Sequence, residues 1–141
     1  MKHVFMDTNV VIDFLANRQP FSADAAKLFN LAVEAKVTIY ISAVSYNNIY
    51  YILRQSLSNA AAIKLMEGLA DITEIADVTD AVIRQSLKTD FKDYEDAIQY
   101  HCALTIPKID FIVTRNTKDF KKSKLPVLTP LEAIKSLNGL G

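Results

Sequence analysis

Cysteine and histidine are scarce in this chain of 141 residues, which contains one cysteine, Cys102, and two histidines, His3 and His101. A lone cysteine excludes an intrachain disulfide framework and most cysteine-based zinc sites, and two histidines leave little room for a histidine-ligated metal. The chain also has only three glycines and four prolines, which argues against low-complexity or disordered structure.

Neither sign of charge is in excess, because 16 Lys and Arg residues balance 16 Asp and Glu residues and the formal net charge is +0. Global charge therefore predicts no strong non-specific attraction to nucleic acid, although a local basic patch stays open. No run approaches the roughly 18 apolar residues of a membrane span, and the N-terminal residues lack the apolar core of a secretory signal. We expect a cytoplasmic protein that does not enter a membrane.

Half of the residues are hydrophobic, which is enough for a sizeable core, and the length predicts one domain over residues 1–141. Apolar and β-branched runs predict strands at 3–6, 37–41, 72–78, 111–114 and 126–128. Helices are predicted at 10–16, from a Ser22 cap onward, after a cap at Ser42 or Ser45, at 59–70 with an end near Gly68, at 79–87, at 94–104, and after the capping box Thr129-Pro130-Leu131-Glu132. This alternation predicts an α/β sandwich with helices on both faces of a mostly parallel sheet.

Acidic and amide residues follow several of the apolar segments. Asp7 comes directly after the first predicted strand, Asp93 and Asp96 lie on one face at a helix start, and Asp119 follows the turn after residues 111–114. Parallel sheets gather such groups at the carboxyl ends of their strands. Carboxylates that converge repel one another unless a proton or a cation neutralises them, so the set predicts a site for Mg²⁺ or Mn²⁺. Taken singly, each of these residues is more typical of an ordinary turn or helix start than of a metal site.

Three motifs in order resemble the PIN domain family: Met6-Asp7-Thr8-Asn9-Val10, then Asp93-Tyr94-Glu95-Asp96-Ala97, then the segment from Ile112 to Phe120. The tail Pro126-Val127-Leu128-Thr129-Pro130 is similar as well. The resemblance implies a Rossmann-like three-layer α/β/α sandwich and a Mg²⁺- or Mn²⁺-dependent ribonuclease. Small members of this kind are often VapC-like toxins of toxin–antitoxin pairs, so the implied partners are an RNA substrate, an antitoxin protein and a second copy of the chain.

By the same resemblance, Asp7, Asp96 and Asp119 match the catalytic, metal-binding carboxylates, and Asp93 is a further ligand one turn before Asp96. The last acidic position is matched by either Asn116 or Asp119, and the short motif does not decide between them. Asn9 is expected to orient Asp7 or a bound water by hydrogen bonding.

The chain departs from the family pattern at Asn48, which stands where a glutamate is expected in the segment Tyr46-Asn47-Asn48-Ile49. An amide offers an oxygen to orient the site, but it has no charge and cannot act as a base. This loss of one negative charge is the ground for an alternative function, a catalytically weakened RNA- or protein-binding module of the same fold.

Basic and aromatic residues near the acidic motifs are candidates for RNA contacts. Arg115, Lys118 and Lys121 are expected to meet RNA phosphates, and the alternative for the lysines is a solvated loop. Tyr50, Tyr51 and Arg54 are expected either to stack on bases or meet a second copy of the chain, or simply to pack against the core.

Three further enzyme or binding classes fit the sequence less well. A phosphoaspartyl hydrolase would need a second aspartate where Asn9 stands, and a receiver domain would need paired acids that the sequence does not show. No glycine-rich turn follows the first predicted strand, which argues against a nucleotide-binding Rossmann module.

Overall fold

The computed structural model describes residues 1–138 and contains a five-stranded sheet whose strands are all parallel. The strand order is β3-β2-β1-β4-β5, with bounds β1 Lys2–Met6, β2 Val37–Ser42, β3 Glu74–Ala76, β4 Phe111–Val113 and β5 Val127–Leu128. The helices are α1 Thr8–Leu15, α2 Ser22–Val33, α3 Ala43–Leu53, α4 Asn59–Ile72, α5 Asp80–Leu87, α6 Tyr94–Leu104 and α7 Pro130–Asn138, with a 3₁₀ turn η1 at Thr117–Phe120. None of the helices in residues 1–138 has the length and apolarity to cross a membrane.

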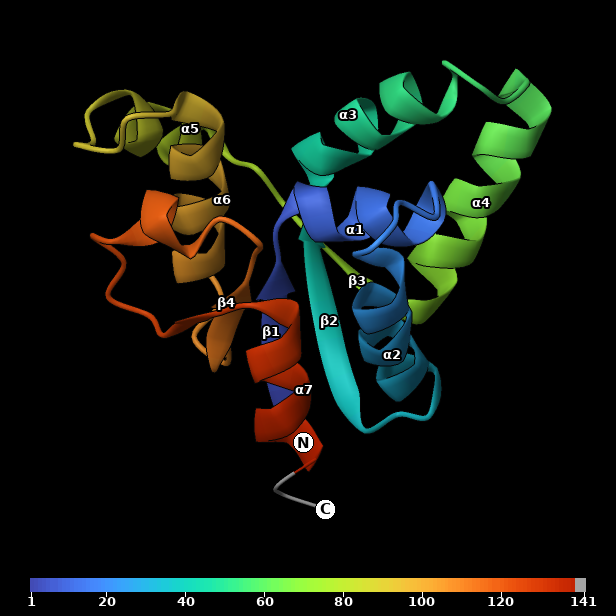
Figure 1. Ribbon diagram of the computed structural model, residues 1–141. Helices are drawn as coiled ribbons and strands as arrows, with labels where there is room; N and C mark the ends of the chain where they lie inside the picture. The colour runs from blue at the N-terminus through green and yellow to red at the C-terminus, as the bar shows by residue number, and fades with distance from the viewer. Residues whose placement is uncertain (139–141) are drawn as a thin grey trace.

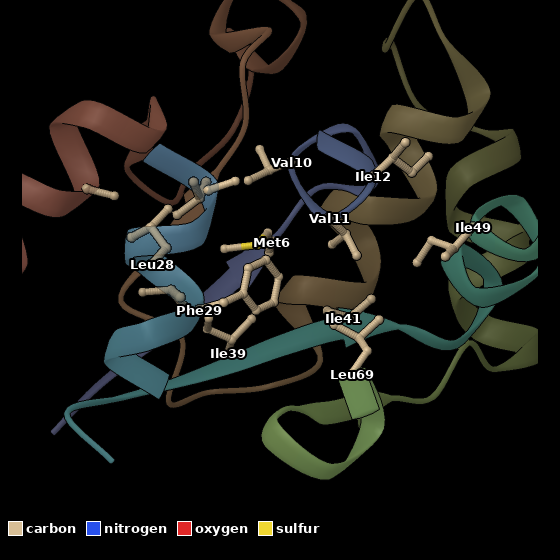
Figure 2. Packing of buried hydrophobic residues seen from close by; sticks show 14 of the residues in the cluster. Met6, Val10, Val11, Ile12, Leu28, Phe29, Ile39, Ile41, Ile49 and Leu69 are labelled. Atoms are coloured by element: carbon tan, nitrogen blue, oxygen red, sulfur yellow. The ribbon is translucent and has the colours of Figure 1, made fainter. Parts of the chain in front are cut away.

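The sheet separates two hydrophobic clusters, as expected for three layers, and this confirms the predicted α/β/α sandwich (Figure 1). Val4 and Met6 of β1 point to the larger cluster, which is covered by α1, α2, α3, α4 and α7. Figure 2 shows Met6 and Ile39 among the side chains of this cluster. Phe5, which alternates with them, points to the opposite cluster under α5 and α6.

Strand β1 lies at the centre of the sheet and pairs in parallel with both β2 and β4. The chain builds β2 and β3 on one side of β1 before it crosses to the other side to form β4 and β5, so the direction of winding reverses beside β1. In open parallel sheets, crevices form at such a reversal, beyond the carboxyl ends of the strands. The fold therefore places the end of β1, and the residue Asp7 that follows it, at a natural binding position.

The helix starts differ from the predictions where a side chain takes the capping role. Helix α1 begins at Thr8 rather than at residue 10, because the Asp7 carboxylate caps it by accepting a hydrogen bond from Thr8 N–H. Ser22 does not cap α2, whose N-cap is Phe21; the Ser22 hydroxyl accepts from Gln19 instead. Of the two candidate serines for α3, Ser42 is the cap.

The boundary between α4 and β3 also lies later in the chain than predicted. Helix α4 continues through the exposed Gly68 to Ile72, since one glycine costs a helix only about 1 kcal/mol relative to alanine and the buried Leu69 anchors the last turn. Strand β3 is correspondingly short, because only Glu74–Ala76 pair with β2. The predicted capping box of α7 is confirmed by reciprocal hydrogen bonds between Thr129 and Glu132.

The single cysteine lies inside the second cluster. Cys102 on α6 is fully buried, and its thiol donates a long hydrogen bond of 3.4 Å to the carbonyl oxygen of Asp77. Burial raises the pKa of the Cys102 thiol to about 11. The thiol is therefore a small apolar group of the core rather than a nucleophile.

Candidate functional site

The predicted acidic residues line one pocket of about 640 Å³ beyond the carboxyl end of β1. Its walls come from α1 and the loop that follows it, from α3, from the start of α6, and from η1 with the residue before it. Among the residues predicted from the sequence, the pocket brings together Asp7, Asn9, Asn48, Asp93, Asp96, Asn116 and Asp119. Arg115, Lys118 and Lys121 are not among its lining residues.

Asp7 is the most deeply buried carboxylate of the pocket, with 6% of its surface exposed. One carboxylate oxygen accepts a hydrogen bond of 2.8 Å from Thr8 N–H, and the other accepts one of 2.7 Å from the hydroxyl of Thr114. Burial raises the pKa of Asp7 above its usual value, despite the opposing effect of these two hydrogen bonds. Asp7 forms no ion pair within residues 1–138, so its charge is held by hydrogen bonds alone.

Asp96 carries the clearest sign of crowding. Partial burial, followed by repulsion from Asp7, Asp93, Asp119 and Glu95, raises the pKa of Asp96 to about 7. These carboxylates are thus close enough to Asp96 to oppose its ionisation. This arrangement favours a cation or a proton in the pocket.

Asp93 also stabilises the start of a helix, which is the local role that its position in the sequence suggested. It is the N-cap of α6, and its carboxylate accepts a hydrogen bond of 3.1 Å from Asp96 N–H. The cap fixes the first turn of α6 and thereby the direction of the Asp96 side chain. Capping and membership of the pocket are compatible, because one carboxylate oxygen remains free of this bond.

Two amide oxygens at the pocket are buried without a hydrogen-bond partner, Asn9 Oδ1 and Gln99 Oε1. Gln99 donates from its Nε2 to the hydroxyl of Ser45 at 3.0 Å and to that of Thr8 at 3.3 Å, so its orientation is fixed. A buried oxygen that lacks a donor is costly unless a ligand or water satisfies it. Both unsatisfied oxygens belong to residues that line the acidic pocket.

Sequence reasoning missed Gln99 and two other lining residues, Arg18 and Tyr94. Gln99 carried a usable signal, since it follows Asp96 by three positions and therefore lies on the same face of α6. Arg18 carried none, because it lies in a loop whose path depends on the fold.

The donor set fits a hard divalent cation such as Mg²⁺ or Mn²⁺. Within residues 1–138 no three His, Cys, Asp or Glu side chains are close enough together to bind one ion directly. Mg²⁺, however, commonly keeps several waters and takes only one or two protein carboxylates. The uncompensated Asp7 carboxylate, the buried Asn9 oxygen and the crowded Asp96 provide such oxygen ligands.

Arg115 has a different environment from the one predicted. Its guanidinium donates to the carboxylate of Asp13 at 2.6 and 3.3 Å and lies 4.0 Å from the centre of the Phe21 ring. Asp13 is 1% exposed, so this is a buried ion pair. In this structure, Arg115 supports the fold beside the pocket rather than lining it.

The aromatic residues of α3 divide into two groups. Tyr50 donates a hydrogen bond to Asn59, and Arg54 donates one of 3.0 Å to the carbonyl oxygen of Leu57, so both stabilise the turn between α3 and α4. Tyr51 is 71% exposed and lines the acidic pocket. Of this predicted group, only Tyr51 is placed to meet a ligand there.

A family model for the PIN domain matches residues 3–118, and the chain belongs to the PIN domain family. The fold is similar to several solved structures, although the sequences are distant. One of them is VapBC2 from Rickettsia felis, bound to a DNA fragment from the VapBC2 promoter. A chain of it is 18% identical to this chain with a TM-score of 0.67, over 90% of this chain and 98% of that one. A toxin–antitoxin complex from Klebsiella pneumoniae gives 23% identity and a TM-score of 0.63, over 90% and 97% of the two chains.

A third similar structure is VapC20 from Mycobacterium tuberculosis, described as a Sarcin-Ricin loop cleaving toxin. It is 15% identical to this chain with a TM-score of 0.61, over 77% of this chain and 86% of that one. No curated protein sequence matches this chain significantly. These structures confirm the predicted PIN-like fold.

Proposed function

We propose that this protein is a Mg²⁺- or Mn²⁺-dependent endoribonuclease that hydrolyses RNA phosphodiester bonds. The observation that carries the proposal is the gathering of four aspartates in one pocket beyond the carboxyl end of β1: Asp7, Asp93, Asp96 and Asp119. Membership of the PIN domain family supports the same reaction class.

A divalent cation held in this pocket by one or two of the carboxylates of Asp7, Asp96 and Asp119, with waters as its other ligands, would supply charge neutralisation at the phosphodiester and acidify a bound water. The chain's own residues have separate tasks. Thr8 and Thr114 hold both oxygens of Asp7 in place, while the buried Oδ1 of Asn9 offers an acceptor that would orient a water.

A carboxylate of this pocket must also take the proton that the attacking water loses, and Asp93, Asp96 and Asp119 are the exposed or partly exposed carboxylates suited to that task. As the water oxygen bonds to phosphorus, the bond from phosphorus to the 3′ oxygen breaks in line. The departing 3′ oxygen takes a proton from solvent, and no covalent intermediate with the protein forms. Asn48 lacks the charge to share this role.

We further propose that the protein is the toxin of a toxin–antitoxin pair, with a small antitoxin protein that covers the acidic pocket and a second copy of the chain as further partner. The similar structures from Rickettsia felis and Klebsiella pneumoniae are such complexes and support this biological setting. Co-purification of a short neighbouring gene product that stops RNA cleavage would test it.

The test of the reaction combines cleavage with metal binding. We expect mixed single-stranded and structured RNAs to be cut with Mg²⁺ or Mn²⁺ and to stay intact in a chelator. Calorimetry should show Mn²⁺ binding that Asp7→Asn and Asp96→Asn each weaken about 10-fold or more, since each variant removes a charged ligand. Asp80→Asn, on the exposed start of α5, should bind Mn²⁺ like the unaltered protein. Equal affinity in all four proteins would contradict the proposed site.

The second candidate function is a catalytically weakened RNA- or protein-binding module. It is favoured by the neutral Asn48 in the pocket wall and by the lack of three directly converging carboxylates in residues 1–138. Metal-loaded protein that binds RNA without cutting it would support this module over the nuclease.

A further inference from the structure

The acidic centre lies between two depressions in the surface. Asp93, Asp96 and Asp119 line the pocket of about 640 Å³ described above, and they also line a second pocket of about 370 Å³. The second pocket is otherwise formed by the loop before α6 and the segment around η1. The two depressions therefore meet at the carboxylates and extend away from them in different directions.

Each depression also carries positive charge. Arg18 is the one Lys or Arg side chain among the lining residues of the first pocket. The second pocket is lined by Lys92, Lys118, Lys121 and Lys122. Of these cations, only Lys122 forms an ion pair within residues 1–138, with Asp90 at 3.5 Å. The others are available to an anionic ligand.

The loop that carries Arg18 is held firmly in place. Arg18 N–H donates to the carbonyl oxygen of Asp13 at 3.0 Å, and the Arg18 carbonyl oxygen accepts from Phe21 at 3.0 Å and from Ser22 at 2.7 Å. The Asp13 side chain is in turn bound by Arg115. The backbone at Arg18 is thus fixed relative to the segment after β4, while its side chain is exposed at the pocket.

Two exposed tyrosines add a second kind of contact to the first depression. Tyr51 is 71% exposed and Tyr94 is 44% exposed, and they reach the pocket from α3 and from the start of α6. Exposed aromatic rings beside a cation are suited to stacking on unpaired bases. The second depression offers mainly lysines, and therefore mainly phosphate contacts.

We propose that one RNA strand crosses the acidic centre and occupies both depressions, with Arg18 on a phosphate on one side and Lys92, Lys118 and Lys121 on phosphates of the other side. This proposal rests on the proposed function, since it assigns the substrate path to the same carboxylates. It requires nucleotides on both sides of the bond that is cut, and it gives Arg18 the role that the sequence had suggested for Arg115.

The test measures RNA binding separately from cleavage. All proteins carry Asp96→Asn, which disables the proposed reaction, and a fluorescently labelled RNA of about 12 nucleotides is titrated by anisotropy in Mg²⁺ at several salt concentrations. We expect Arg18→Ala to weaken binding several-fold and to lower the slope of log affinity against log salt by about 0.7, the loss of one phosphate contact. Lys118→Ala and Lys121→Ala should each have a similar effect.

One control variant matches the charge that is removed, and one double variant tests whether the two sides act independently. Lys36→Ala changes a lysine paired with Glu34 before β2, at the opposite end of the strands, and should leave affinity and slope unchanged. Combining Arg18→Ala with Lys118→Ala should add the two losses in log affinity, because the residues lie in separate depressions.

The proposal is overturned if only one side responds, or if Arg18→Ala behaves like Lys36→Ala. These outcomes are independent of the proposed reaction, because binding is compared within a background that does not cut. If the unaltered protein fails to cleave RNA while both sides contribute to binding, the strand path stands and the nuclease function falls.

Discussion

Asp7 and Asp13 are both buried carboxylates at helix α1, and they differ in what satisfies them. Asp13 is 1% exposed and receives the guanidinium of Arg115 at 2.6 Å. Asp7 is 6% exposed and receives only the hydroxyl of Thr114 and the N–H of Thr8. Within residues 1–138, the charge of Asp13 is compensated by a cation and the charge of Asp7 is not.

This difference separates a supporting group from a candidate ligand-binding group. The ion pair at Asp13 ties α1 to the segment after β4, whereas Asp7 adds a negative charge to a pocket that already holds Asp93, Asp96 and Asp119. Burial of a carboxylate is therefore not by itself a sign of function. What matters is whether the fold also supplies the opposite charge.

The largest expected effect on this comparison is a loss of stability when the Asp13–Arg115 pair is broken. Arg115→Met leaves Asp13 buried without a partner, so we expect the free energy of unfolding in urea to fall by about 3–5 kcal/mol. Asp13→Leu combined with Arg115→Met should recover much of this loss. Arg84→Met, which breaks the exposed pair with Asp80, should cost about 1 kcal/mol or less. A loss at Arg115 no larger than at Arg84 would remove the distinction between the two aspartates.

A smaller effect concerns the charge of the pocket. Asn48→Glu adds a carboxylate to its wall, and we expect calorimetric Mn²⁺ affinity to rise about 10-fold, as for a charged ligand replacing a neutral one. Asn47→Glu makes the same change at the neighbouring exposed position, which does not line the pocket, and should have no effect. Equal responses at positions 47 and 48 would show that Mn²⁺ is bound elsewhere.

The smallest effect is the pH dependence of stability without metal. Partial burial, together with repulsion from Asp7, Asp93, Asp119 and Glu95, raises the pKa of Asp96 to about 7 in the folded chain, from a value of about 4 in an unfolded chain. The folded state therefore binds a proton more tightly, and the stabilising contribution of that proton is lost as pH rises from about 4 to about 7. Since Asp96 is partly exposed, we expect a loss of about 1 kcal/mol.

Asp96→Asn should lack this part of the pH dependence and melt about 3–5 °C higher than the unaltered protein at pH 8 in a chelator. Asp80→Asn, at an exposed position, serves as the matched control. A melting temperature that rises with pH in the same range would contradict the crowding of carboxylates around Asp96.

The residues of the acidic site were predictable from the sequence because each follows or begins a recognisable element. Asp7 ends an apolar strand, and Asp93 and Asp96 begin a helix, so their positions follow from local patterns and from parallel-sheet topology. The same local patterns place the strands correctly to within a few residues. They do not give the side-chain partners.

The environment of Arg115 was not predictable because its partner Asp13 lies 102 residues away in the chain. Nothing near Arg115 in the sequence indicates that a buried carboxylate will meet it. Arg18 illustrates the converse, since its loop acquires a place at the pocket only through backbone hydrogen bonds to α1 and α2. Lys118 and Lys121 were identified, but their location in a second depression depends on how η1 folds against α6.

The burial of Cys102 has a practical consequence for spectroscopic work. With its thiol enclosed beneath α6 and a pKa of about 11, the native chain presents no reactive thiolate at neutral pH. A cysteine introduced at the exposed position of Tyr51 would then be the sole site for a maleimide dye or spin label. Such a probe would report on the occupancy of the acidic pocket without any need to mutate the natural cysteine.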